Sequence, residues 1–251
     1  MGRTFAIGDI HGDLDALERL LARLPPLAAE DTLLFVGDYV DRGPASAQVV
    51  ALVRGLHART PARVVALRGN HEDAWVRVAR GGGWPEFVLP RSNGCYEAYR
   101  SFRGEPTPAA ADAPTTAEMA DMLSGAFIPP DVLDWMESLP HFHEDDHAIY
   151  VHAGLKRPAP GAPFAHPRDV DPQRALLWLR DRDFFEHYDG KLVVFGHTQT
   201  PMLPTELSTY TVDDPSDLWA GPRAAGIDTG AGKGGFLTAL ELPARRVYES
   251  R

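Results

Sequence analysis

Five short polar clusters in this sequence contain the residue types that bind metal ions and move protons. Each combines glycine with aspartate, asparagine or histidine, and each follows a predicted strand directly or after one residue. They are GDIHG at 8–12, GDYVDRG at 37–43, GNHE at 69–72, HAG at 152–154 and GHT at 196–198. In an open α/β sheet, ligands bind beyond the carboxyl ends of the strands. We therefore expect all five clusters to meet at one edge of one sheet.

The side chains in these clusters suit divalent cations, because they offer oxygen and imidazole nitrogen but no thiolate. Asp9 and His11 lie two residues apart at a strand end and can point into one crevice, while Asp38 has two oxygens and can bridge two ions. Two cations about 3.5–4 Å apart activate water and clamp phosphate oxygens during displacement at phosphorus. The candidate ligands are Asp9, His11, Asp38, Asn70, His152 and His197.

Three further polar residues suit the remaining steps of phosphoester hydrolysis. His71 is next to Asn70 but is not needed as a ligand, and Asp41 could orient its imidazole. Such a pair is typical of a general acid that protonates a leaving oxygen. Arg42 offers a planar fork that matches phosphate oxygens.

Hydrophobic patterning predicts the elements that position these clusters. Strands are expected at 4–7, 32–36 and 63–67, each followed by a helix: one capped by Asp13, one opened by Pro44 and one over 72–80. Three strand–loop–helix units in succession indicate an α/β core with a largely parallel sheet.

The three glycines at 81–83 end this alternation of strands and helices. We expect residues 81–140 to form a small, mostly helical insertion that shapes substrate access. The insertion is too short and irregular to hold its own core, so the chain is expected to form a single domain over 1–251. Helices are predicted at 95–102, 116–123, 131–139 and near 172–180, and later strands at 148–151, 192–195, 236–242 and 246–248.

Composition narrows the class of protein. The chain has 251 residues, is 44% hydrophobic and 24% charged, and carries a formal net charge of −10. These values are typical of a soluble globular protein, and such an acidic chain is a poor match for nucleic acid. There is no apolar run long enough to span a membrane, and the lone Cys95 excludes a disulfide framework. We expect a cytoplasmic protein, most simply a monomer, with no nucleic-acid or membrane partner.

The five motifs in this order resemble those of the calcineurin-like metallophosphoesterases, and within them the PPP-type serine/threonine protein phosphatases of bacteria. The resemblance runs from residue 8 to about 198, and the segment GIDTG at 226–230 looks like the family's closing strand and turn. It implies an α/β fold with a central β-sandwich flanked by helices, in four αββα layers.

The resemblance also implies roles for single residues. Asp9, His11 and Asp38 would hold one metal ion, and Asp38 would share the second with Asn70, His152 and His197. His71 would be the general acid supported by Asp41, with Arg42 as a phosphate clamp. The segment LLWLRDR at 176–182 looks like that of the bacterial members and makes Arg180 the second clamp, with Arg182 and Arg157 as alternatives. The two ions would be Mn, with Fe or Zn suiting the same ligands.

Two positions divide the branches of this family. Dinucleoside-tetraphosphate hydrolases share the scaffold but generally lack an acidic residue at the position of Asp41 and have aspartate at that of Glu72. The sequence therefore favours hydrolysis of phosphoserine and phosphothreonine in proteins, by direct attack of metal-activated water without a phospho-enzyme. Diadenosine-tetraphosphate hydrolysis is the alternative within enzymes. The alternative from another functional class is a binding scaffold without catalytic activity. However, every ligand, acid and arginine position of the site keeps a residue suited to its role.

Two other segments look like sites and are expected not to be. The tract HFHEDDH at 141–147 resembles a metal-binding run, but the alternation of a strand followed by a polar turn predicts a solvated hairpin. The glycine-rich segment at 230–235 lacks the serine or threonine that follows lysine in a phosphate-binding loop.

Overall fold

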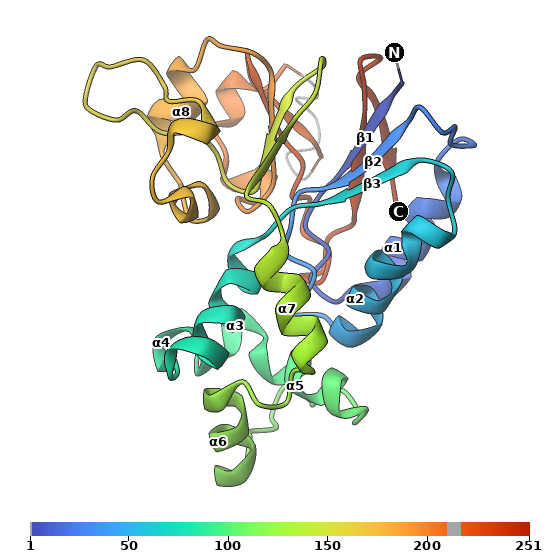
Figure 1. Ribbon diagram of the computed structural model, residues 1–251, viewed down its shortest axis with the longest axis vertical. Helices are drawn as coiled ribbons and strands as arrows, with labels where there is room; N and C mark the ends of the chain where they lie inside the picture. Colours follow the sequence, from blue (N-terminus) through green and yellow to red (C-terminus); the bar gives the residue numbers. More distant parts are fainter. Residues whose placement is uncertain (1, 210–216) are drawn as a thin grey trace.

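Two five-stranded sheets face each other at the centre of the protein (Figure 1). The computed structural model describes residues 2–209 and 217–251. The first sheet has the order β10-β9-β1-β2-β3 and the second has the order β4-β5-β6-β8-β7. The strands of the first sheet are β1 (Thr4–Ile7), β2 (Thr32–Phe35), β3 (Arg63–Ala66), β9 (Thr238–Leu242) and β10 (Arg246–Glu249). Those of the second are β4 (Phe142–Glu144), β5 (Ile149–Val151), β6 (Val193–Phe195), β7 (Trp219–Ala220) and β8 (Ala224–Gly226).

Both sheets are mixed, whereas the strand–helix rhythm predicted one largely parallel sheet. β1, β2 and β3 are parallel as expected, but β9 and β10 return as an antiparallel hairpin along β1. In the second sheet β5, β6 and β8 are parallel, and β4 and β7 pair antiparallel at its two edges. Short turns join three antiparallel pairs, β4–β5, β7–β8 and β9–β10, as is usual for strands that are neighbours in both sequence and sheet.

Alternating side chains explain why the two sheets pack face to face. Along β1, Ala6 enters the core between the sheets, while Phe5 and Ile7 enter the core on the opposite side. Along β6, Val194 faces the same inter-sheet core, and Val193 and Phe195 face away from it. Every residue of both strands is buried, as expected of strands covered on both faces.

Helices cover the outer faces and complete four layers. α1 (Leu14–Arg23) and α2 (Ser46–Gly55) pack on the first sheet, and α8 (Arg182–His187) packs on the second (Figure 1). The α/β sandwich with flanking helices is therefore confirmed. The helix predicted near 172–180 is instead a 3-10 helix, Gln173–Leu177, and α8 follows it. Among the described residues, no helix combines the length and hydropathy that crossing a bilayer requires.

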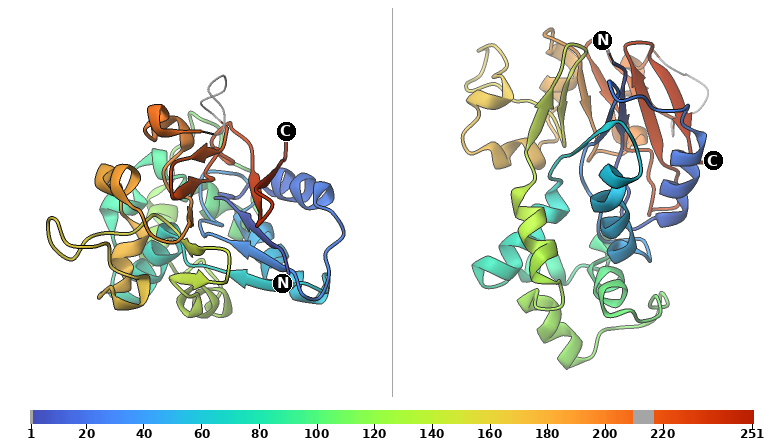
Figure 2. Two further views of the ribbon diagram at one scale, coloured as in Figure 1. Left: turned by 90° about the horizontal axis from the view of Figure 1, so that it is seen from above. Right: turned by 45° about the vertical axis from the view of Figure 1, so that its right-hand side comes forward.

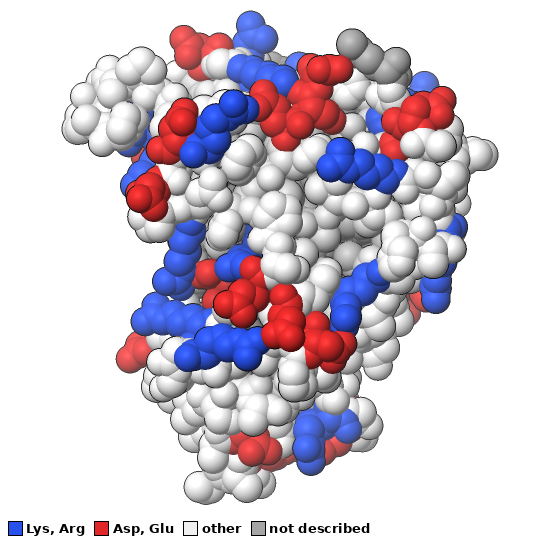
Figure 3. All heavy atoms as spheres, in the orientation of Figure 1, with Lys and Arg blue, Asp and Glu red and all other residues white. Residues whose placement is uncertain are grey.

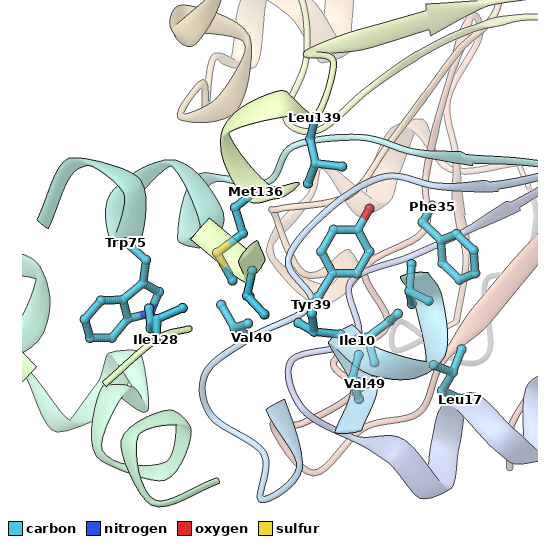
Figure 4. Packing of buried hydrophobic residues seen from close by; sticks show 14 of the residues in the cluster. Ile10, Leu17, Phe35, Tyr39, Val40, Val49, Trp75, Ile128, Met136 and Leu139 are labelled. Atoms are coloured by element: carbon cyan, nitrogen blue, oxygen red, sulfur yellow. The ribbon is translucent and has the colours of Figure 1, made fainter. Parts of the chain in front are cut away.

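The helical segment after β3 extends from one end of the sandwich, as Figure 2 shows. It comprises α3 (Asn70–Gly81), α4 (Pro85–Val88), α5 (Cys95–Arg103), α6 (Thr116–Ser124) and α7 (Pro130–Ser138). Its apolar side chains join the core of the first sheet, since Trp75, Ile128 and Met136 belong to one cluster with Ile10 and Tyr39 (Figure 4). The insertion is thus packed on the sandwich through a shared core.

Candidate active site

The carboxyl ends of five strands bring the predicted metal ligands into one buried cluster. β1, β2 and β3 of the first sheet and β5 and β6 of the second all contribute, so the expectation of a single sheet edge was wrong. Two facing sheets can do this because the carboxyl ends of their parallel strands lie at the same end of the sandwich. The exposed fractions are 1% for Asp9, 0% for His11, 2% for Asp38, 5% for Asn70, 0% for His152 and 5% for His197.

Left-handed backbone conformations turn several of these side chains into the cluster. Of the six non-glycine residues with positive φ in the described chain, five belong to the motifs: His11, Asp38, Asp41, Arg42 and His197. Such conformations are unfavourable for residues with a Cβ atom and persist where the surroundings hold them. Part of that support is direct, because the backbone N–H groups of Ile10 and His11 both donate to the carbonyl of Asp38, at 3.0 and 2.9 Å.

Glu72 holds the loop that carries Asp38. Its Oε2 accepts hydrogen bonds from the backbone N–H groups of Asp38 and Gly69, at 2.9 and 3.0 Å. Its Oε1 accepts from Tyr39 at 2.8 Å and Val40 at 3.3 Å. One buried carboxylate therefore fixes four backbone amides at the centre of the site.

Asp38 lies between two groups of possible cation ligands. Its Oδ2 is 3.3 Å from Nε2 of His11, and its Oδ1 is 3.4 Å from Nε2 of His152. Asn70 Oδ1 lies 2.8 Å from both His152 Nε2 and His197 Nδ1. Two ligands at right angles around an ion about 2.1 Å away would be about 3 Å apart, so these separations suit a shared coordination shell.

The histidine hydrogen bonds leave lone pairs directed at this cluster. Nδ1 of His11 donates to the Val40 carbonyl at 3.0 Å, and His11 Nε2 is buried with no hydrogen-bond partner in the described chain. Nδ1 of His152 donates to the Val36 carbonyl at 2.9 Å, so its Nε2 lone pair faces Asn70 Oδ1, which is also an acceptor. Two acceptors in contact are stabilised by a cation, and backbone carbonyls commonly orient metal-binding histidines in this way. The residues present therefore fit two divalent ions.

The pKa shifts of Asp38, His11 and His197 favour the forms that bind metal, whereas burial raises the pKa of Asp9 to about 6. Burial opposes ionisation of Asp38, but the facing rings of His152 and its neighbours hold the pKa of this carboxyl well below its ordinary value. Burial lowers the pKa of His11 and of His197 well below the usual histidine range. An ionised carboxylate and neutral imidazoles can bind a divalent cation without first losing protons.

His71 is held at the edge of the cluster by a buried hydrogen-bond chain. Its Nδ1 lies 2.6 Å from Asp41 Oδ2, and the indole Nε1 of Trp75 donates to both oxygens of Asp41, at 2.9 and 3.0 Å. His71 Nε2 is 4.0 Å from Asp38 Oδ2 and accepts from Arg42 Nη2 at 3.2 Å. The imidazole thus has a fixed orientation, with Nδ1 at Asp41 and Nε2 facing Arg42 and Asp38.

Two of the predicted arginines lie at this site and two lie elsewhere. Arg42 touches His71, and Arg180 donates to the backbone carbonyl of His197 at 3.5 Å. Arg182 pairs with Glu186 and Glu206, and Arg157 pairs with Asp183. Of the three arginines expected as alternatives for the second clamp, Arg180 is the one placed beside a predicted ligand.

The family model of the calcineurin-like phosphoesterases matches residues 2–201. The chain belongs to this family. The match covers the five motifs between residues 8 and 198.

Two curated relatives point to different substrates. A symmetrical bis(5'-nucleosyl)-tetraphosphatase from Dechloromonas aromatica is 35% identical over 154 residues, which are 61% of this chain and 44% of the relative. A Caenorhabditis elegans protein provisionally named as a serine/threonine-protein phosphatase is 46% identical over 69 residues, 26% of this chain and 18% of that protein. The matched segments thus span less than half the length of these relatives.

Solved structures share the fold of this phosphoesterase over nearly its whole length. One provisionally named as a diadenosine tetraphosphatase has a TM-score of 0.59 at 21% identity, covering 99% of this chain and 92% of the other. A metallophosphoesterase from Sphaerobacter thermophilus has a TM-score of 0.53 at 20% identity, covering 99% and 86%. At these identities the likeness establishes the fold alone.

One buried carboxylate at the site was missed as a site residue by sequence reasoning. Asp228 follows β8, in the same position that the five motifs occupy after their strands, and it pairs with Lys233 Nζ at 3.1 Å. Burial and the neighbouring Asp9 raise its pKa well above the ordinary value. The loop that carries Lys233 contacts the site, because a Cβ atom on Gly232 would lie 2.3 Å from the His11 carbonyl oxygen.

The tract at 141–147 forms the expected hairpin. β4 and β5 pair antiparallel, and His143 stacks on Tyr150 with ring centroids 6.1 Å apart. Glu144 is engaged by Lys191 and His166. His143 therefore serves packing, and Glu144 serves ion pairs at the surface.

We predict that Trp75→Phe lowers kcat while leaving the bound metal unchanged. The substitution removes the indole donor to Asp41 but keeps an aromatic ring in the core, so Asp41 and His71 lose part of their alignment. Loss of a hydrogen bond to a charged group costs about 1.5–3 kcal/mol, which corresponds to a fall of roughly ten- to a hundredfold if it is expressed only in the transition state. Steady-state kinetics with metal analysis checks this, and a kcat equal to that of the wild type would contradict it.

Proposed function

We propose that this phosphoesterase hydrolyses dinucleoside polyphosphates such as diadenosine tetraphosphate with two divalent cations. Phosphoester hydrolysis rests on one observation above all, the buried Asp38 between two groups of possible imidazole and amide ligands. The substrate class is supported by the 35% identity to a symmetrical bis(5'-nucleosyl)-tetraphosphatase over a segment of 154 residues. In a symmetrical reaction, one water adds across the central anhydride and two molecules of ADP form. The comparisons therefore favour the substrate that the motifs had placed second.

The proposed ligand sets use every residue of the buried cluster. Asp9, His11 and Asp38 would hold one ion, and Asp38, Asn70, His152 and His197 would hold the other. When bound, such ions lower the pKa of a coordinated water and neutralise phosphate oxygens. Oxygen and imidazole donors suit Mn, which we propose, and also Fe or Zn.

The side chains around the cluster would bind the phosphate and supply a proton. Arg42 and Arg180 offer planar guanidinium groups on two sides of the cluster, at His71 and His197, and can each donate hydrogen bonds to phosphate oxygens. Asp41 holds Nδ1 of His71, so a proton for the leaving oxygen would have to come from Nε2, which accepts from Arg42 in this structure and can carry a proton only after Arg42 has moved away. When Arg42 turns to the phosphate, this nitrogen is free to protonate the departing oxygen.

A second candidate substrate is phosphoserine or phosphothreonine in proteins, and the Asp41–His71 pair favours it. A serine alkoxide is a far more basic leaving group than ADP, so its departure depends more strongly on a positioned acid. The 2.6 Å contact between His71 and Asp41, with Trp75 behind it, provides that acid. Glu72 is the other position at which the sequence resembles the protein phosphatases more than the tetraphosphate hydrolases.

One assay separates the two candidates. The Mn-loaded protein is given diadenosine tetraphosphate or a phosphoserine peptide, and ADP or phosphate release is followed at equal enzyme concentration. We expect kcat/KM for the dinucleotide to exceed that for the peptide by at least about a hundredfold, a difference of ~2.7 kcal/mol in transition-state binding. Chelation with EDTA should stop both reactions. A preference for the peptide would reject the dinucleotide proposal and restore the protein-phosphatase interpretation.

A further inference from the structure

A cavity of about 360 Å³ opens on the surface beside His197. α8 forms one side, and the 3-10 turns Thr200–Met202 and Thr205–Leu207 form the other. Its polar lining comes from Arg180, Arg182, Thr198 and Glu206, and its apolar lining includes Phe185 and Met202.

The cavity begins where the proposed metal cluster ends. Thr198 directly follows His197, and Arg180, which lines the cavity, donates to the His197 carbonyl. Thr198 is only 4% exposed, and its hydroxyl has no hydrogen-bond partner in the described part of the chain. A buried hydroxyl without a partner is costly, and a ligand oxygen would satisfy it.

Arg180 and Arg182 allow the cavity to bind anions. Arg182 Nη2 lies 2.6 Å from Glu206 Oε1, but the two side chains are 64% and 58% exposed, so this pair contributes little to stability and can open. Figure 3 shows acidic and basic side chains intermixed on the side of the molecule that carries α8. A phosphate group could therefore replace the Glu206 carboxylate on Arg182 without leaving a buried charge unpaired.

Beside these charges lies apolar surface that no other part of the described chain covers. Met202 is 69% exposed, and Leu89, at 48%, is the other exposed large hydrophobic residue in the described chain. With Phe185 it forms an apolar wall within the cavity. Exposed apolar side chains at the edge of a polar cleft are typical of a surface that a ligand covers.

We propose that this cavity binds the nucleoside diphosphate half of the substrate that lies beyond the scissile bond. Its phosphates would contact Arg180, Arg182 and the Thr198 hydroxyl, and its base would lie on the wall of Phe185 and Met202. This inference rests on the proposed dinucleotide activity and names a binding site for half of that substrate. An inorganic phosphate lacks the second phosphate and the base, so it cannot reach both ends of the cavity.

Binding of ADP and of inorganic phosphate to the full Mn-loaded chain tests this site by calorimetry. Arg182→Ala removes one charge-assisted contact, so we expect the ADP dissociation constant to rise about tenfold relative to that of phosphate. Glu206→Gln removes the competing carboxylate, and we expect ADP to bind about threefold more tightly. Arg168→Ala is the matched control, because Arg168 is an exposed arginine that pairs with Glu144 outside the cavity. It should change neither constant.

The results that would overturn this site are distinct from those that reject the proposed function. The cavity is not the ADP site if Arg182→Ala and Glu206→Gln leave the ADP dissociation constant at the wild-type value. The same holds if they change the dissociation constants of ADP and of phosphate by the same factor. If Arg182→Ala fails to fold, the direction of the Glu206→Gln change decides alone. Should the dinucleotide resist hydrolysis while ADP binding still responds as expected, the proposed function fails and the nucleotide site stands. If the dinucleotide is hydrolysed but neither substitution changes the affinity for ADP, the proposed ADP site is rejected and the proposed function is kept.

Discussion

Asp38→Asn is expected to abolish turnover and to reduce bound metal to less than one ion per chain. The amide keeps the size of the side chain but loses the charge, and only one of its two terminal atoms can act as a ligand. Asp38 faces His11 through one oxygen and His152 through the other, so both proposed ion sites lose an anionic ligand at once. We expect kcat/KM to fall by on the order of a thousandfold, or ~4 kcal/mol of transition-state stabilisation.

Metal analysis, kinetics and circular dichroism of the same preparation test this expectation. Asp134→Asn is a matched control, since Asp134 is an exposed aspartate on α7 that pairs with Arg80. It should retain both the metal and the activity. If Asp38→Asn kept two ions per chain and more than a tenth of the activity, Asp38 could not be the shared ligand.

His71→Asn is expected to lower kcat and leave both metal ions in place. The asparagine cannot donate a proton to a leaving oxygen, and such donors contribute about 10²–10⁴-fold. The loss should depend on the leaving group, because p-nitrophenolate departs readily without a proton and an alkoxide does not. We therefore expect at least a tenfold larger fall in kcat for an alkyl phosphate than for p-nitrophenyl phosphate.

The metal content of this variant separates two roles for the ring. His71 Nε2 lies 4.0 Å from Asp38 Oδ2, close enough for His71 to be a ligand instead of an acid. Loss of one ion in His71→Asn would assign it to the metal, and full activity would reject the acid. His57→Asn serves as the control, because His57 is exposed and bonds only to the Arg54 carbonyl among the described contacts.

The motifs determined most of the local structure of the site. The strand ends at β1, β2, β5 and β6 lie where hydrophobic runs give way to glycine and polar residues, and the helix after β3 starts at Asn70, two residues before the predicted position. These features are local, since they depend on propensity, alternation and turn residues within a few positions. The same patterns predicted the three main helices of the insertion within one residue at each end, at α5, α6 and α7.

Such local patterns could not predict the contacts between segments that are far apart in the chain. Trp75 stands four residues after His71 on one helix face, a spacing visible in the sequence, but its bond to Asp41 depends on how the loop at 37–43 folds. Gly94 packs so closely on Arg42 that a Cβ atom would lie 2.1 Å from the Arg42 backbone nitrogen, so the insertion contacts the backbone of the proposed phosphate clamp. β7 and β8 are only two and three residues long and carry no periodic pattern.

The sequence by itself determined which residue types follow which strands, and therefore the chemistry open to this protein. Five ordered motifs were enough for that, because side-chain type decides which residues are candidates for binding metal or donating a proton. Only the tertiary structure decided that two facing sheets, and not one, bring these motifs together. It also placed Asp228 and Lys233 beside them and left a cavity with two arginines next to His197. Those outcomes depend on packing between segments far apart in the chain, and that packing is set by the whole core.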